Sequence, residues 1–220
     1  TIDENLVFIT ADAGAFGLKR FKEDYPERFI NVGVAEQAMV LLATGLAMTG
    51  KNVFIYSIIP FITQRCLEHI KVNIASMNLP ITIVGCGSGL SFGFDGPTHH
   101  GTQDIAAMRS ISNIRIFSPC DAASSMIAAE LSYESKKPAY VRLDKGIKQK
   151  IYEINNINKT GIKEVYKSSK NIIISTGEMT QIAKKVCDNI EKENELGLID
   201  LTILNPIDEK LLYSLVKDAS

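Results

Sequence analysis

The chain has 220 residues, of which 45% are hydrophobic and 22% are charged, and its formal net charge is −1. This composition is typical of a folded protein with one large domain or one and a half, and it excludes a disordered chain. The near-neutral charge gives no indication of a nucleic-acid partner, and the apolar runs are too short to cross a membrane.

Short apolar runs alternate with helical patterns along most of the sequence. We predict strands at residues 6–10, 29–34, 52–59, 81–84, 114–117 and 138–143. We predict helices at residues 38–48, 61–78, 102–110 and 121–135. Strands that alternate with helices pair in parallel and place helices on both faces of the sheet. The sequence therefore predicts a doubly wound, mostly parallel α/β sheet, with its ligand site at the carboxyl ends of the strands.

The most apolar helix, residues 38–48, begins directly after a carboxylate, Glu36. Because this helix has almost no polar face, we expect it to be buried on most sides. An acid at the edge of a core is costly unless a partner or a ligand uses it. The residues alone leave two interpretations open, a carboxylate that interacts with the helix dipole or a functional acid.

A long glycine-rich loop, residues 87–101, contains Asp95, His99 and His100. Loops of this length in a compact domain usually carry function. Its glycines lack the Gly-x-Gly-x-x-Gly spacing of a dinucleotide-binding turn, because position 90 is leucine. The four cysteines are widely spaced and form no Cys-x-x-Cys pair. We therefore expect reduced thiols in a cytoplasmic protein and no metal site within this chain.

Two segments resemble motifs of one enzyme family. Asn31-Val32-Gly33-Val34-Ala35-Glu36-Gln37 is similar to the glutamate motif of the pyrimidine-binding domain in thiamine-diphosphate enzymes of the transketolase family. Asp95-Gly96-Pro97-Thr98-His99 resembles the family's Asp-Gly-Pro-Thr-His loop. The resemblance covers about Thr10 to Gly146. It implies a component of a transketolase, which transfers a two-carbon ketol unit between sugars or sugar phosphates.

The resemblance assigns cofactor roles to four residues. Glu36 matches the glutamate that hydrogen-bonds the aminopyrimidine of thiamine diphosphate and activates the cofactor. Phe61 matches the aromatic residue that stacks on the pyrimidine, with a core phenylalanine at a helix start as its structural alternative. Arg65, one helical turn later, lines the same pocket or is solvated. Asp12 matches an acid near the cofactor and the boundary between subunits, with an Asx-type turn as its alternative.

The resemblance also assigns substrate roles. Asp95 and His99 match a group that orients substrate hydroxyls and a group that transfers a proton to a substrate oxygen. His100 stands where transketolases usually have glutamine. For both histidines, a polar loop surface is the structural alternative.

The residues with which the family binds a sugar phosphate are only partly present in this sequence. Arg142 and Lys145 lie near the position of a phosphate-contacting arginine of the family. Gly87-Ser88 stands where the family has a basic residue. The sequence therefore leaves open a ketol transfer onto or from a modified sugar.

The family holds the diphosphate and Mg²⁺ through a different domain, which carries Gly-Asp-Gly, and this sequence contains no Gly-Asp-Gly. We therefore expect this chain to hold only the pyrimidine end of the cofactor. A diphosphate-binding partner subunit would hold Mg²⁺, in a split enzyme with active sites between unlike subunits. The expected assembly is a homodimer or a heterotetramer, with no membrane partner.

The chain is expected to contain two domains. Residues 1–146 match the pyrimidine-binding domain, residues 147–170 are a polar linker, and residues 171–220 resemble the start of the transketolase C-terminal α/β domain. The second domain is predicted to contain a strand at 171–176, a helix at 178–193 and a strand at 196–204. Three other readings remain open: a 2-oxoacid dehydrogenase beta subunit, a deoxyxylulose-phosphate-synthase-like enzyme, and a non-catalytic α/β partner subunit.

Overall fold

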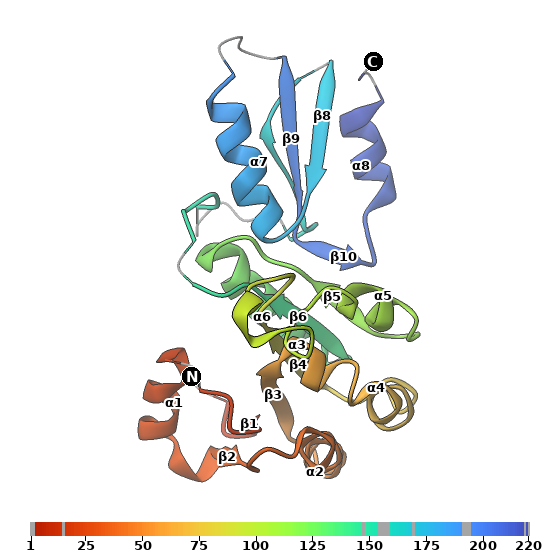
Figure 1. Ribbon diagram of the computed structural model, residues 1–220. Helices are drawn as coiled ribbons and strands as arrows, with labels where there is room; N and C mark the ends of the chain where they lie inside the picture. Colours follow the sequence, from red (N-terminus) through yellow and green to blue (C-terminus); the bar gives the residue numbers. More distant parts are fainter. Residues whose placement is uncertain are drawn as a thin grey trace. The chain divides into compact units, whose positions relative to one another are not determined.

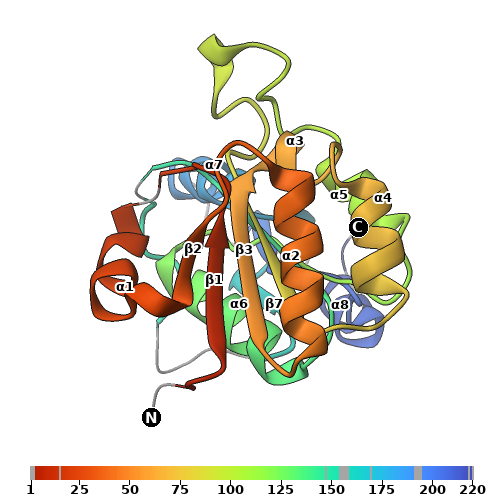
Figure 2. The same cartoon turned by 90° about the horizontal axis from the view of Figure 1, so that it is seen from below.

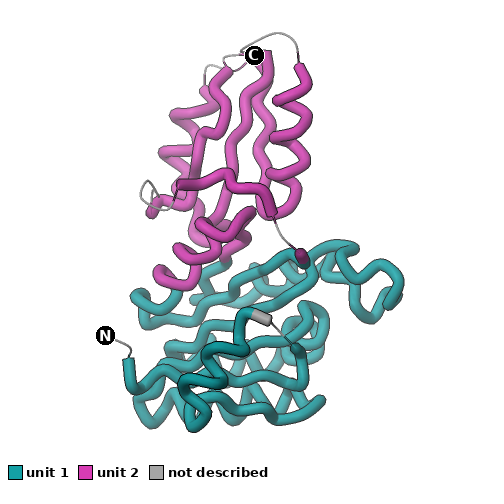
Figure 3. Tube along the Cα trace, turned by 90° about the vertical axis from the view of Figure 1, so that its left-hand side faces the viewer, with its two compact units in different colours: residues 1–116, 132–145 teal, residues 117–131, 146–220 magenta. Residues whose placement is uncertain are grey.

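The computed structural model describes residues 3–14, 16–146, 148–153, 159–168, 170–190, 195–217 and 219. The chain forms two compact units (Figure 3). Unit 1 comprises Thr1–Ile116 and Ser132–Lys145, and unit 2 comprises Phe117–Leu131 and Gly146–Ser220. All the site residues predicted from the sequence lie in unit 1.

Unit 1 is built on parallel strands. They are β1 (Leu6–Thr10), β2 (Phe29–Asn31), β3 (Asn52–Ile58), β4 (Ile81–Cys86), β5 (Arg115–Phe117) and β6 (Ala139–Leu143). The last residue of β5 is the first residue of unit 2. The strand order is β5-β6-β4-β3-β1-β2, and the neighbours from β2 to β6 pair in parallel. Figure 2 shows β2, β1 and β3 side by side. The mostly parallel α/β fold predicted from the sequence is confirmed.

The helices of unit 1 are short, apart from the one that begins at Glu36. They are α1 (Lys19–Asp24), α2 (Glu36–Met48), α3 (Ile59–Ile62), α4 (Leu67–His69) and α5 (Asp104–Arg109). Three 3₁₀ turns lie at Phe16–Leu18, Pro26–Arg28 and Gly93–Asp95, and a π-helical turn lies at Ile70–Ala75. The core lies where α2 packs on the sheet and against the π-helical turn, and its fully buried side chains include Ile9, Met39, Ile55, Ile70, Ile74 and Ile83.

The single helix predicted for residues 61–78 is wrong, because α3, α4 and the π-helical turn replace it. Pro60 lies in the first turn of α3, where its missing N–H is tolerated. The Thr63 hydroxyl then donates to the Ile59 carbonyl at 2.6 Å, and the amides of Gln64 and Arg65 both donate to the Pro60 carbonyl. The amides of Thr63 and Gln64 keep regular bonds to the carbonyls four residues back, but the Arg65 amide reaches back five residues to Pro60, which interrupts the regular helical ladder. The apolar side chains that recur every four residues in this segment are nevertheless fully buried, at Ile62, Cys66, Ile70 and Ile74.

Helix α2 is buried on one face only. Its inner face contributes Met39, Val40, Ala43 and Ala47 to the core. The other face exposes an apolar stripe, with fractional exposures of 77% for Val34, 49% for Leu41, 38% for Leu42 and 63% for Met48. We refer to these four residues as the α2 stripe. The prediction of burial on most sides is therefore not met among the residues that the structure describes, where the α2 stripe is left exposed.

Unit 2 contains most of α6 (Ala122–Ser135), whose last turn belongs to unit 1. Its three-stranded sheet has the order β7-β9-β8, with β8 parallel and β7 antiparallel to β9. Figure 1 shows α7 beside this sheet, where it packs on β8 and β9. The elements are β7 (Ile162–Tyr166), β8 (Asn171–Ser175), α7 (Glu178–Asp188), β9 (Leu196–Leu201), β10 (Ile203–Asn205) and α8 (Glu209–Val216).

Three expectations for this part of the chain are corrected. The segment 147–170 is not linker throughout, because β7 pairs with β9, and a five-residue edge strand leaves little periodicity in a sequence. The helix expected at 178–193 ends at Asp188, and the strand expected at 196–204 is interrupted at Thr202, whose amide donates to Gly161. Residues 147, 154–158, 169 and 191–194 lie outside the described residues.

Two negative findings apply to the part of the chain that the structure describes. No helix there has the length and apolar character that crossing a membrane requires. No group of three or more His, Cys, Asp or Glu residues in the same ranges is placed to hold a metal ion.

Candidate functional site

Glu36 is the first residue of α2, and only 2% of its side chain is exposed. The turn before it is held by Asn31, whose side-chain oxygen accepts hydrogen bonds from the amides of Asp12 (2.9 Å) and Gly33 (3.0 Å). Gly33 has a φ of 73°, which favours glycine. Arg65 Nη1 lies 2.6 Å from Glu36 Oε2, and this ion pair offsets the cost of burying the carboxylate.

A series of aromatic and charged contacts extends from this ion pair to the glycine-rich loop. The Arg65 guanidinium lies 4.4 Å from the centre of the Phe61 ring. The Phe61 and His99 rings meet edge to face at 4.9 Å, and His99 lies 6.1 Å from the ring of Phe92. The Lys145 ammonium lies 4.4 Å from the centre of that Phe92 ring. The fold thus brings together Glu36 and four other predicted site residues, in contacts that connect four separate segments of the chain.

The sequence analysis did not single out Phe92. A Cβ added to Gly87 would lie 2.0 Å from the Phe92 ring, so the ring packs directly on this glycine, whose φ is 88°. The sequence could have indicated this contact, because an aromatic side chain packs this closely on the backbone only at a glycine, and Phe92 lies in a glycine-rich loop.

The loop 87–101 is closed at its base by its own backbone. The amide of Gly89 donates to Gly101 O at 2.8 Å, and the amide of Gly101 donates to Gly89 O at 2.9 Å. Beyond this closure the loop projects from the same end of the sheet as α3, which follows β3 directly (Figure 2). The position agrees with a ligand site at the carboxyl ends of the strands.

The other predicted residues of the loop lie apart from the aromatic contacts. Asp95 ends a 3₁₀ turn and is exposed. The His100 Nε2 atom lies 3.4 Å from the carbonyl of Gly93, within the loop itself. The half-buried His99 also interacts through Nδ1 with the Thr98 hydroxyl at 3.0 Å.

Arg142 forms an ion pair with Asp104, a residue that the sequence analysis missed. Its Nε donates to Asp104 Oδ2 at 2.8 Å, and its Nη2 donates to the Gly101 carbonyl at 3.2 Å. Tyr140 donates its hydroxyl to the same Asp104 oxygen at 2.7 Å. Burial and the neighbouring negative charge of Asp104 raise the pKa of Tyr140 well above its ordinary value. The available signal was the alternation of Tyr140 and Arg142 on β6, which places both on one face of the sheet.

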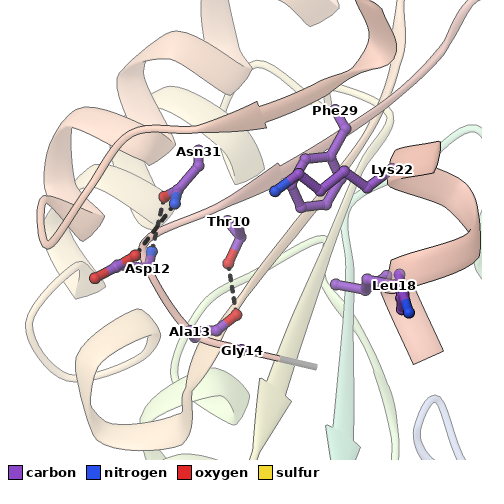
Figure 4. A pocket seen from close by; sticks show the side chains of 9 residues that line it. Thr10, Asp12, Ala13, Gly14, Leu18, Lys22, Phe29 and Asn31 are labelled. Atoms are coloured by element: carbon purple, nitrogen blue, oxygen red, sulfur yellow. Dashed lines mark hydrogen bonds between the residues drawn. The ribbon is translucent and has the colours of Figure 1, made fainter. Parts of the chain in front are cut away.

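Asp12 lies at a different hollow of unit 1, shown in Figure 4. Its φ is 56°, and its side chain accepts a hydrogen bond from the Asn31 amide group at 3.2 Å. The hollow has a volume of about 280 Å³, and the ammonium of Lys22 lies 5.8 Å from the centre of the Phe29 ring beside it. The Asx-type contact in this region belongs to Asn31, which accepts from the Gly33 amide two residues on, and Asn31 is the residue that joins this hollow to the Glu36 turn.

Cys66 lies directly after Arg65 and is fully buried. Burial and the negative charge of Glu36 raise the pKa of the Cys66 thiol to about 12. The thiol is therefore protonated at neutral pH and does not act as a nucleophile.

Comparisons with known proteins agree with this geometry. Residues 1–149 match the family model of the transketolase pyrimidine-binding domain. A Methanocaldococcus jannaschii protein assigned as a transketolase C-terminal section is 36% identical over 95% of this chain and 68% of its own length. One of the subunits of the apulose-4-phosphate transketolase of Phocaeicola vulgatus is 30% identical over 94% of this chain and 67% of its own length. The 1-deoxy-D-xylulose-5-phosphate synthase of Clostridium perfringens is 32% identical over 98% of this chain but only 35% of its own length.

A solved structure described as a split gene transketolase, in the form of an inactive beta4 tetramer, is similar to the whole chain. The TM-score is 0.85 at 26% identity, and the similarity covers 97% of this chain and 71% of that one.

The fold and the buried acid at the start of α2 define the pyrimidine-binding component of a thiamine-dependent enzyme. The chain belongs to the transketolase family, and it is a component of a transketolase-like transferase. The relatives that match over most of their length are separate sections or subunits, which implies a partner subunit for the other section.

The site fits one end of thiamine diphosphate. The buried Glu36 carboxylate and the flat Phe61 ring are the groups that an aminopyrimidine needs for a hydrogen bond and for stacking. Among the described residues, no group of three or more His, Cys, Asp or Glu side chains is placed to hold the metal that accompanies the diphosphate.

Proposed function

We propose that this chain is the pyrimidine-binding subunit of a split transketolase that transfers a two-carbon ketol unit between sugars or sugar phosphates. The observation that carries the proposal is the buried Glu36 carboxylate, connected through Arg65 and Phe61 to His99. Bound thiamine diphosphate supplies the carbon nucleophile that cleaves the ketose, and the residues of this chain bind and orient it.

In this proposal, Glu36 hydrogen-bonds a ring nitrogen of the aminopyrimidine. Because the carboxylate is buried, this hydrogen bond is stronger than it would be in water. Arg65 holds the carboxylate in place, and Phe61 forms the apolar wall of the pyrimidine pocket. Asp12 lies near the cofactor at the boundary between subunits, and its link to the Glu36 turn through Asn31 supports this placement.

His99 is the proposed proton-transfer group for a substrate oxygen, and its ring is positioned by contacts with Phe61 and Phe92. Asp95 orients substrate hydroxyl groups, and its exposure supports this role. His100 and Lys145 complete the substrate contacts. Lys145 supplies a positive charge for a phosphate, and it lies over the Phe92 ring, which the His99 ring also contacts.

A second subunit holds the diphosphate and Mg²⁺ in this proposal, and the α2 stripe forms a contact between subunits. Four exposed apolar side chains on and beside one helix are unusual on a free surface and typical of an interface. The assembly is a homodimer or a heterotetramer, and the tetramer of the similar split gene transketolase supports a contact between subunits of this type.

The proposed domains are a pyrimidine-binding domain at residues 1–146 and a C-terminal-like α/β unit at 171–220. The family match to residues 1–149 supports the first boundary. All four cysteines are free thiols, which supports a reducing compartment such as the cytoplasm.

Calorimetry tests whether this chain binds the cofactor only together with the diphosphate-binding subunit. Thiamine diphosphate and Mg²⁺ are titrated into this chain alone and into its mixture with the diphosphate-binding subunit. Binding in the mixture only is the expected result. Tight binding to the chain alone would contradict the proposed partner role, and no binding in either sample would favour a non-catalytic subunit.

Activity then tests the reaction type in the reconstituted pair. A ketose donor with an aldose acceptor should be turned over, and the Glu36→Gln variant should lose this activity while its circular dichroism spectrum is unchanged. Arg20→Gln, a change at an exposed residue of α1, is the control. Turnover of pyruvate in place of the ketose would instead favour a synthase or 2-oxoacid dehydrogenase component.

A further inference from the structure

Asp104, Tyr140 and Arg142 form a buried polar cluster below the glycine-rich loop. Asp104 is 1% exposed, Tyr140 is fully buried, and only 13% of the Arg142 side chain is exposed. One carboxylate oxygen of Asp104, Oδ2, accepts from both the Tyr140 hydroxyl and Arg142 Nε. Asp104 and Arg142 neutralise each other, which is the condition under which two charges are tolerated at this depth.

The same arginine reaches the base of the loop. Arg142 Nη2 donates to the carbonyl of Gly101, the residue that also exchanges two backbone hydrogen bonds with Gly89. A Cβ added to Gly101 would lie 2.7 Å from the Gly87 carbonyl oxygen, so the two ends of the loop pack backbone against backbone. The loop closure therefore has a side-chain support that comes from β6.

His99 is two residues from this support. Its ring must keep its edge-to-face contact with Phe61, on α3, although the loop between Gly89 and Gly101 projects away from the sheet. A loop tethered at Gly101 limits where the His99 ring can lie. A loop without that tether would allow the ring many positions, only some of which face a substrate.

We propose that Asp104, Tyr140 and Arg142 clamp the base of loop 87–101, and that Arg142 acts as a positioning residue for His99 and not as a substrate contact. Arg142 is suited to this task because its planar guanidinium donates to Asp104 and to Gly101 from different nitrogens. Lysine has a single nitrogen and cannot reproduce that geometry. The catalytic part of the inference rests on the proposed function, whereas the clamp itself does not.

Hydrogen exchange of the full-length chain tests the clamp without cofactor, partner or substrate. Arg142→Gln is expected to speed exchange of the Gly89 and Gly101 amides about tenfold, the effect of losing one hydrogen bond to a charged group. Arg142→Lys should show most of this increase, and Arg20→Gln should show none. Amides of β3 and β4 should exchange at the wild-type rate in all variants.

Tyr140→Phe is the second variant, because it removes only the hydroxyl that donates to Asp104 and keeps the buried ring. It should speed exchange of the Gly101 amide by a smaller factor than Arg142→Gln does. If Arg142→Gln does not fold, Arg142→Lys and Tyr140→Phe decide the question. Loop exchange at the wild-type rate in Arg142→Lys and Tyr140→Phe would overturn the clamp.

Kinetics of the reconstituted enzyme separate positioning from substrate contact. A positioning role predicts that Arg142→Lys lowers kcat by the same factor for a phosphorylated and an unphosphorylated ketose, with little change in KM. A rise in KM for the phosphorylated ketose alone would overturn the positioning role and assign Arg142 to the phosphate. Absence of activity in the wild-type pair would contradict the proposed function, and the exchange result would still decide the clamp.

Discussion

The Glu36–Arg65 ion pair has very different surroundings on its two sides, and this asymmetry predicts the effect of removing either partner. The Glu36 side chain is 2% exposed, whereas the Arg65 side chain is 44% exposed. Breaking a fully buried pair costs about 3–5 kcal/mol, and an exposed pair contributes about 0–1 kcal/mol. Since one partner is buried and the other reaches water, we expect Arg65→Gln to lower the free energy of unfolding by about 2 kcal/mol.

The reverse change should cost much less. Glu36→Gln removes the buried charge and leaves a solvated arginine, so we expect a loss of about 0.5 kcal/mol or less. In the double variant no buried charge is left unpaired, and its stability should therefore match that of Glu36→Gln. The coupling energy between the two positions should then equal the whole cost of Arg65→Gln, about 2 kcal/mol.

Urea denaturation followed by circular dichroism measures this cycle, because the chain contains no tryptophan for fluorescence. Arg20→Gln is the matched control, since the Arg20 side chain is 92% exposed and its ion pair with Asp24 is on the surface. Equal midpoints for Arg65→Gln and Arg20→Gln would refute the reasoning. So would a double variant less stable than Arg65→Gln, because the cost would then not come from an unpaired buried charge.

Three further predictions address other parts of unit 1. Gly101→Ala should destabilise the chain by about 2 kcal/mol or more, because its Cβ would lie 2.7 Å from the Gly87 carbonyl oxygen. Thermal unfolding measures this loss, with Gly14→Ala as the control because a Cβ at Gly14 would meet no atom within 4 Å. Leu41→Lys on the α2 stripe should weaken the association between subunits about tenfold or more, as measured by analytical ultracentrifugation, and should leave the unfolding midpoint of the isolated chain unchanged. Unchanged association would show that the α2 stripe is not part of the interface. Burial raises the pKa of the Cys66 thiol from 9.0 to about 12, so between pH 9 and pH 12 the folded state keeps a proton that the unfolded chain loses, and the free energy of unfolding should fall. Cys66→Ala should reduce the slope of the free energy of unfolding against pH by about 1.4 kcal/mol per pH unit in this range. An unchanged slope would contradict the raised pKa of Cys66.

The sequence by itself determined the elements that depend on neighbouring residues. The strands of unit 1 are runs of β-branched and aromatic side chains, and most of their observed bounds lie within a few residues of the prediction. The place of Glu36 at the start of an apolar helix and the length of the loop 87–101 were also readable, because glycine and helix periodicity act locally. These features were enough to place the candidate site at the carboxyl ends of the strands.

The tertiary structure decided which side chains meet. Arg65 and Arg142 looked alike in the sequence, as basic residues near the site, yet one pairs with Glu36 and the other with Asp104. Arg65 is 29 positions from Glu36 and Arg142 is 38 positions from Asp104, so no local sequence pattern relates the partners of either pair.

The same limit explains the other misses. The packing of Phe92 on Gly87 and the pairing of β7 with β9 depend on where the chain folds back, and the exposure of the α2 stripe depends on which face of α2 packs on the sheet. Periodicity indicates which face of an element is apolar. What covers that face, and which charge pairs with which, is fixed only when the packed elements bring distant residues within contact distance.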